Sequence, residues 1–176
     1  MAGFDLVGAV AEYFLGPVLA RIRRWILRPE CLKHDRLLFR RANIILDERT
    51  LIDTLDEIAN LHQHRGSFLS QLETFCRVFE ELGTQFLERR LRRAADDLCT
   101  SLRQLTGFIG VNFFTLKQTI SLGPNEMRFG FHPEKRHEEK WRAFYNGKAV
   151  ELEILADEVS KKYSRYRTLA KDCLLE

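Results

Sequence analysis

The chain has 176 residues, 45% of them hydrophobic and 30% charged, a composition that is typical of a globular domain and excludes an extensively disordered chain. Lys and Arg number 28 against 25 Asp and Glu, and so small an excess argues against nucleic acid as the main partner. Only four prolines and ten glycines interrupt the chain, so we expect a few long elements rather than many short strands.

The first 29 residues form an apolar and then amphipathic segment, which we expect to precede a single helical-bundle domain over residues 30–176. Its apolar part, residues 6–20, is shorter than the roughly 20 residues that span a bilayer. Pro29 is expected to end the segment. Several of its residues would suit an anionic membrane surface, namely Phe14, Arg21, Arg23, Arg24, Trp25 and Arg28. Packing into the bundle or onto a second subunit is the alternative.

The N-terminal segment does not resemble a secretory signal peptide, because its basic residues follow the apolar stretch and no cleavage site comes after them. The four cysteines have neither metal-ligand nor redox spacing, and they are Cys31, Cys76, Cys99 and Cys173. We interpret them as small hydrophobic residues of a reduced compartment. A cytoplasmic location follows, with peripheral attachment to a membrane as the variant.

Two helices are expected in the first part of the bundle. Apolar residues at helical spacing predict the first over residues 32–46. Asp47 is a suitable N-cap for the second, because its carboxylate can accept hydrogen bonds from the free amides of the next turn. The second helix should continue to about His64, and Gly66 should end it.

Two further helices are expected over about residues 67–87 and 90–114, where apolar residues recur every three or four positions. The phase slips at Glu88, which indicates either a kink in one helix or a tight junction between two helices, and we favour two helices. A basic cluster follows at this junction, and it could contact phosphate or nucleic acid through Arg89, Arg90, Arg92 and Arg93. Neighbouring carboxylates would neutralise much of that charge.

Residues 117–133 differ in character from the helical stretches. Short runs with apolar residues at 119–122 and 127–131 flank a turn signal at Gly123 and Pro124, which predicts a small hairpin or ordered loop. An isolated hairpin is marginal in water, so it should pack against the helices.

One long helix is expected at the C-terminus, beginning near Pro133. Its apolar residues keep a three-and-four spacing from Trp141 to Cys173, and the stripe continues through Asn146 and Gly147. This predicts a helix of about 40 residues, some 60 Å long. Packing of this stripe into the core is the first interpretation. A helix this long could also extend past the bundle and form a coiled coil, with candidate interface residues Trp141, Tyr145, Tyr163 and Tyr166.

The sequence offers no catalytic, cofactor or metal site that we can assign. His62 and His64 lie two positions apart, so on a helix their rings would diverge instead of sharing one metal ion. Neither a nucleophile elbow nor a glycine-rich phosphate loop occurs. We therefore lean against an enzyme.

The fold class that follows is all-α, an elongated helical bundle of about five to six helices with a long C-terminal helix and the small hairpin or loop. The favoured function is a non-enzymatic protein–protein interaction module that self-associates or presents helix faces to a protein partner. Two alternatives stay open: a peripheral membrane protein anchored by residues 4–28, and a helical nucleic-acid-binding or nucleolytic protein that uses its arginine clusters.

Overall fold

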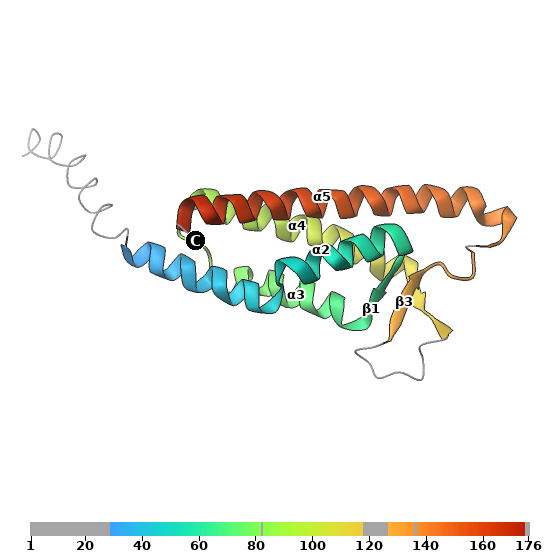
Figure 1. The fold of residues 1–176 in the computed structure, drawn as a ribbon, viewed down its shortest axis with the longest axis horizontal. Coiled ribbons are helices and arrows are strands. Elements are labelled where there is room, and N and C mark those ends of the chain that lie inside the picture. The colour runs from blue at the N-terminus through green and yellow to red at the C-terminus, as the bar shows by residue number, and fades with distance from the viewer. Residues whose placement is uncertain (1–28, 82, 118–126, 136, 175–176) are drawn as a thin grey trace, which may run out of the picture.

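The computed structural model describes residues 29–81, 83–117, 127–135 and 137–174, and it confirms an all-α helical bundle with a long C-terminal helix (Figure 1). The candidate membrane residues of segment 1–28 lie outside this part of the chain. Long helices lie side by side, and a small antiparallel sheet closes one end of the bundle. We call that end the sheet end.

The two helices predicted before residue 65 are both present, and the structure differs from the prediction where the second one ends. Residues 29–45 are helical. Asp47 caps α2 (Glu48–Asp56) as expected, and its Oδ1 accepts a 2.9 Å hydrogen bond from the Thr50 amide. The π-helix η1 (Glu57–Leu61) continues α2 and gives way to His62, whose φ is 54°. The predicted helix end near His64 is therefore a few residues too late.

Helices α3 (Gly66–Glu80) and α4 (Arg89–Asn112) form an antiparallel pair inside the bundle. Gly66 begins α3 instead of ending the preceding helix, which corrects that prediction. The predicted extension of α3 to residue 87 is also wrong, although Phe86 is buried. The buried carboxylate of Asp35 accepts the amides of Leu87 and Glu88 at 2.8 and 2.9 Å, which holds the chain outside a helix before α4.

Three short strands make the sheet: β1 (Gln63–Arg65), β2 (Phe113–Thr115) and β3 (Arg128–Phe131). Their order is β1-β3-β2, and both pairings are antiparallel. An extended run is predicted from the sequence at β3 but not at β1, whose three residues are all polar. The predicted helix over 90–114 is two residues too long, because Phe113 and Phe114 belong to β2. The expected partner run at 119–122 lies outside the described residues.

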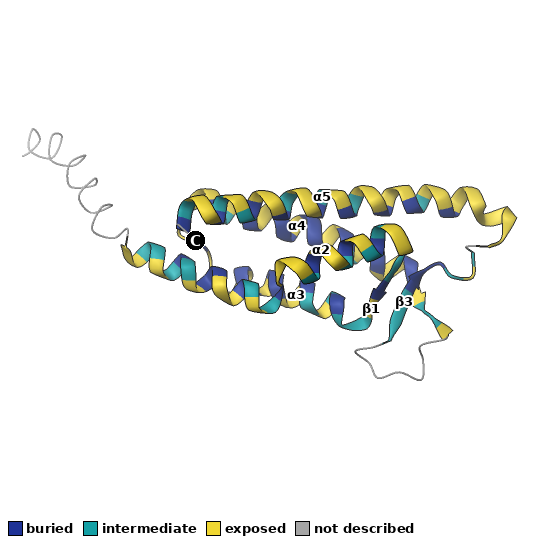
Figure 2. Ribbon diagram, viewed as in Figure 1, coloured by how far each residue is buried: buried dark blue, intermediate teal, exposed yellow. Residues whose placement is uncertain are grey.

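Helix α5 (Arg142–Leu174) has 33 residues and follows a short 3-10 turn, η3 (Glu139–Trp141). It is shorter than predicted because the chain after Pro133 turns before the α-helix begins. The expected stripe is buried against α4 from Tyr145 to Ala170, and the opposite face is exposed (Figure 2). Gly147 lies inside the helix with open space beside its Cα, so no neighbour in this chain requires a glycine there.

Candidate functional site

The sheet end carries a cleft of about 610 Å³ over the outer face of the sheet. Alternation along β3 turns Phe131 toward the core and Gly130 outward, where Gln63 and Phe114 are its cross-strand neighbours. The cleft is lined by His62, Gln63, Phe114, Thr115, Leu116, Lys117, Gly130, Phe131, Pro133, Glu134, His137 and Tyr145.

Leu116 lies against Gly130 on the floor of this cleft. A Cβ at Gly130 would lie 2.6 Å from Cδ2 of Leu116, so the end of the leucine side chain would have to move. The absence of a Cβ lets the Leu116 side chain lie directly on the β3 backbone, which leaves a low apolar floor between Gln63 and Phe114.

His62 and Tyr145 form the polar inner wall of the cleft. The Nδ1 atom of His62 lies 2.7 Å from the Tyr145 hydroxyl oxygen, which connects the end of η1 to the first turns of α5. The His62 backbone adopts the left-handed conformation, which L-residues with a Cβ rarely adopt. Strain of this kind persists only where the surroundings enforce it, and it is frequent at functional sites.

His132 is the second residue with a left-handed backbone, with a φ of 37°. Its ring is buried, and Nε2 donates to Oδ1 of Asn112 at 3.1 Å. The Asn112 amide is oriented by donating from Nδ2 to the Phe108 carbonyl at 2.8 Å. The ring of His132 packs between Phe114 and Phe144, at centroid distances of 5.2 and 5.4 Å.

Three aromatic side chains remain exposed around this end, and we call them the aromatic rim: Phe114 at 45%, Trp141 at 37% and Phe144 at 40%. Trp141 and Phe144 meet at an interplanar angle of 75°, with their centroids 6.1 Å apart. The Nζ of Lys135 lies 4.8 Å from the centroid of each of these two rings, a cation–π arrangement.

Charged residues of both signs lie at the sheet end. Between residues 117 and 148 the sequence has seven Lys and Arg against four Glu, but Arg128 pairs with Glu57 and Lys148 with Glu151, both from outside this stretch. Lys117 and His137 line the cleft directly, as does Glu134. We call Lys117 and the nearby Lys135 the basic surround, and the cleft combines it with an apolar floor and the aromatic rim.

His64 lies behind the cleft, on the core side of the sheet. Its ring stacks on Phe129 at 5.4 Å with an interplanar angle of 9°, and Phe113 lies 5.3 Å away. Nδ1 donates to the Arg65 carbonyl at 2.8 Å, whereas Nε2 is buried without a hydrogen-bond partner among the described residues. Burial lowers the pKa of His64 from its ordinary 6.5, against smaller opposing effects of the Arg65 carbonyl and of Glu57.

The candidate interface and phosphate-binding residues of the sequence analysis lie mostly outside the cleft. Tyr145, Tyr163 and Tyr166 are enclosed by the helices of their own chain, and only Trp141 of the four interface candidates is exposed. Arg89, Arg90, Arg92 and Arg93 do gather in the first turn of α4. There the Arg92 Nε donates to the Phe86 carbonyl at 2.7 Å, and Asp35 and Glu88 bring carboxylates to the same helix end.

Sequence reasoning missed the cleft, because its residues come from segments distant in the chain. The one usable signal was the turn-rich stretch 117–133, which was recognised as unlike the helices but not as part of a site. His62, the segment after β3 and the start of α5 meet only through tertiary packing.

In the described part of the chain, no three or more His, Cys, Asp or Glu residues are grouped so as to hold a metal ion. Nor is any described helix both long and apolar enough to cross a bilayer. No family model matches the chain, and no similar protein was found among curated proteins or solved structures.

Proposed function

We propose that this protein is an interaction module that binds a short, extended, acidic segment of a protein partner in the cleft at the sheet end. The observation that carries the proposal is a cleft with exposed aromatic residues beside it. Phe114 lines the cleft, and the ring of His132 lies between Phe114 and Phe144, so the aromatic rim continues from the cleft onto the neighbouring surface. Exposed aromatic residues are typical of protein interfaces, where they contribute much of the binding free energy.

The size and the polar wall of the cleft favour a short extended segment. Its volume of about 610 Å³ falls within the range that small ligands and short peptides occupy. The backbone amides and carbonyls of an extended segment are free to bond with a polar wall, whereas those of a helix bond within the helix. A partner side chain could pack on Leu116 and Phe114, while its backbone meets the polar wall at His62 and Tyr145.

The basic surround favours an acidic partner. Lys117 lines the cleft together with Glu134, and Lys135 lies over the rings of Trp141 and Phe144. Complementary charge raises the rate of encounter and disfavours basic competitors. Carboxylates on either side of an apolar anchor would therefore give the best match.

Self-association has weaker support. The exposed face of α5 does present Val150 at 53% and Ile154 at 61% exposure. Glu151, Glu153 and Glu158 flank these residues, so a second copy laid along this face would bring like charges together. Phosphate binding at the start of α4 is likewise less favoured, because carboxylates lie at the same helix end.

The proposal is tested by selecting binders from a display library of random peptides and measuring their affinity in solution. The sheet-end variant carries Trp141→Ala with Phe144→Ala, and the outer-face variant carries Val150→Ala with Ile154→Ala as the matched control. Selected peptides should be rich in Asp and Glu and contain an apolar residue. The sheet-end variant should bind them at least about tenfold more weakly, and the outer-face variant should bind normally.

Circular dichroism should show that both variants keep the helical fold. A selection that enriches no peptide contradicts the proposal, as do peptides that bind the sheet-end variant as tightly as the wild type. Enrichment of basic peptides would contradict the assigned charge of the partner.

A further inference from the structure

Two free cysteines lie close together on neighbouring helices inside the bundle, and neither of them lines the cleft. Cys76 lies on α3 and Cys99 on α4, and both side chains are buried. The Sγ of Cys76 donates a hydrogen bond to the Cys99 carbonyl oxygen at 4.0 Å. Sequence spacing alone gave no reason to pair them.

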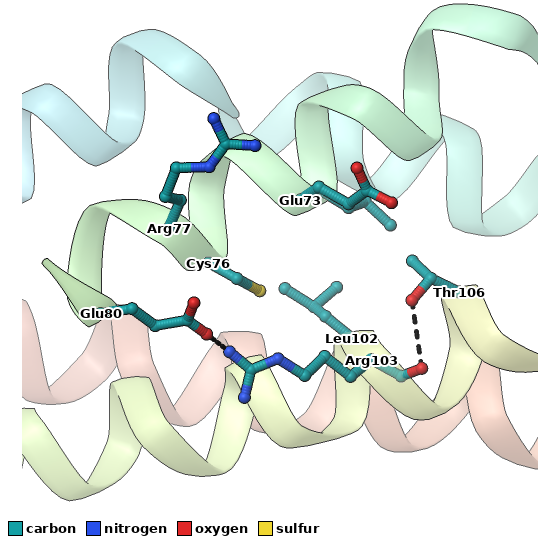
Figure 3. Close-up of a pocket in the computed structure, with 8 residues that line it drawn as sticks. Glu73, Cys76, Arg77, Glu80, Leu102, Arg103 and Thr106 are labelled. Atoms are coloured by element: carbon teal, nitrogen blue, oxygen red, sulfur yellow. Dashed lines mark hydrogen bonds and ion pairs between the residues drawn. The ribbon is translucent and has the colours of Figure 1, made fainter.

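Cys76 is reached from the surface through a pocket of about 240 Å³ between α3 and α4. Figure 3 shows the thiol at the centre of this pocket, with Glu73 and Thr106 on one side and the ion pair between Glu80 and Arg103 on the other. The space admits a small oxidant such as hydrogen peroxide. Cys99 does not line the pocket, so an oxidant that enters it meets Cys76 first.

The two thiols differ in acidity. Interaction with the Cys99 side chain lowers the pKa of the Cys76 thiol. Burial opposes this effect, and the positive charge of Arg103 adds a smaller lowering. The same interaction raises the pKa of Cys99, and burial raises it further. Thiolate is the reactive form of cysteine, so this asymmetry favours Cys76 as the attacking sulfur and leaves Cys99 protonated beside it.

We propose that Cys76 and Cys99 are a peroxide-reactive thiol pair, which closes to a disulfide between α3 and α4. The Cys76 thiolate attacks one oxygen of hydrogen peroxide, the O–O bond breaks, and sulfenic acid and hydroxide form. The Cys99 sulfur then attacks the Cys76 sulfur and displaces the hydroxyl group. The Cys99 proton leaves with that group as water, so two electrons pass from the thiol pair to the peroxide.

The contact between the two cysteines brings them into reach of one another. Cys76 Sγ lies 4.0 Å from the carbonyl oxygen of Cys99, so the sulfur of Cys76 is already at the backbone of its partner. A disulfide requires Cα atoms roughly 4.4–6.8 Å apart, and this is the separation that α3 and α4 must reach when the bond closes. The link would join two helices that run antiparallel beside each other in the bundle (Figure 1).

The test is peptide mapping of the full chain under non-reducing conditions after treatment with equimolar hydrogen peroxide. The expected product is a linked Cys76–Cys99 peptide pair, lighter than the two reduced peptides by two hydrogen atoms. Cys31 and Cys173, which are less buried, serve as internal controls that should remain reduced at this dose. Oxidation of Cys31 or Cys173 ahead of the pair would overturn the proposal, as would a pair that stays fully reduced.

Variants assign the roles within the pair. Cys99→Ser should leave a sulfenic acid on Cys76 that a dimedone reagent traps, whereas Cys76→Ser should leave Cys99 unmodified. The double variant Cys31→Ser with Cys173→Ser should still form the link at the wild-type rate. Trapping on Cys99 instead of Cys76 would overturn the assigned order of attack. The mapping of the wild-type chain decides the proposal even if a serine variant fails to fold.

Discussion

The Nδ1 atom of His62 and the hydroxyl of Tyr145 lie 2.7 Å apart, and this contact ties the end of η1 to α5 across 83 positions of sequence. It fixes the corner at which the helices, the sheet and the cleft meet. His62 holds its left-handed backbone at this corner, and Tyr145 is the first residue of the buried stripe of α5. The contact therefore links the stability of the bundle to the shape of the cleft.

Replacing Tyr145 with Phe should lower the free energy of unfolding by about 1 kcal/mol, because it removes a hydrogen-bond partner of His62 from a largely buried position. Tyr163→Phe is the matched control. The Tyr163 hydroxyl is buried without a hydrogen-bond partner among the described residues, so its removal should be neutral or slightly stabilising. Urea denaturation of both variants measures the difference, and equal losses would show that the His62 contact contributes nothing.

Replacing Asp35 with Ala should destabilise the chain by about 3 kcal/mol. Its buried carboxylate accepts two backbone amides at the start of α4, and the variant would leave both without this partner. Asp53→Ala is the control, since its exposed ion pair with Arg49 should contribute less than about 1 kcal/mol. Thermal and urea unfolding should separate the two variants clearly, and a loss at Asp35 no larger than at Asp53 would contradict the capping role.

The buried imidazole of His64 should make stability depend on pH. Burial lowers its pKa in the folded chain below the ordinary 6.5, so between these two values the unfolded chain binds a proton that the folded chain does not. The contribution is fully present above pH 6.5 and is lost as the pH falls toward the lowered folded pKa.

The comparison variant is His64→Phe, which keeps an aromatic ring beside Phe129 and Phe113 and removes the titrating group. Free energies of unfolding should be measured for both proteins from pH 8 to pH 5. The difference between them should shift in favour of the variant as the pH falls below about 6.5. A difference that stays constant with pH would show that His64 does not titrate differently on folding.

The long helices could be predicted because their apolar residues repeat without a break over many turns. In α5 the stripe from Tyr145 to Ala170 determined the buried face directly, and Gly147 did not interrupt it. The end of α3 was missed because Phe86 is buried from a non-helical segment that Asp35 holds in place. A helical spacing of apolar residues cannot distinguish that case from one more turn of helix.

The site could not be predicted for a related reason. Strand β1 is polar and only three residues long, so it carries no alternation of its own, and β3 alone determines its register. The cleft depends on Gly130 lying against Leu116, and the thiol pair depends on the packing of α3 on α4. Such contacts arise from tertiary structure and leave no pattern in a single sequence.

The most direct test of the binding surface is an amide NMR spectrum of the protein, recorded with and without a selected acidic peptide. The account predicts the largest shifts at the Phe114 and Gly130 amides and at the Trp141 indole, with Val150 and Ile154 unchanged. Shifts centred on Val150 and Ile154, with the residues of the cleft unaffected, would contradict it.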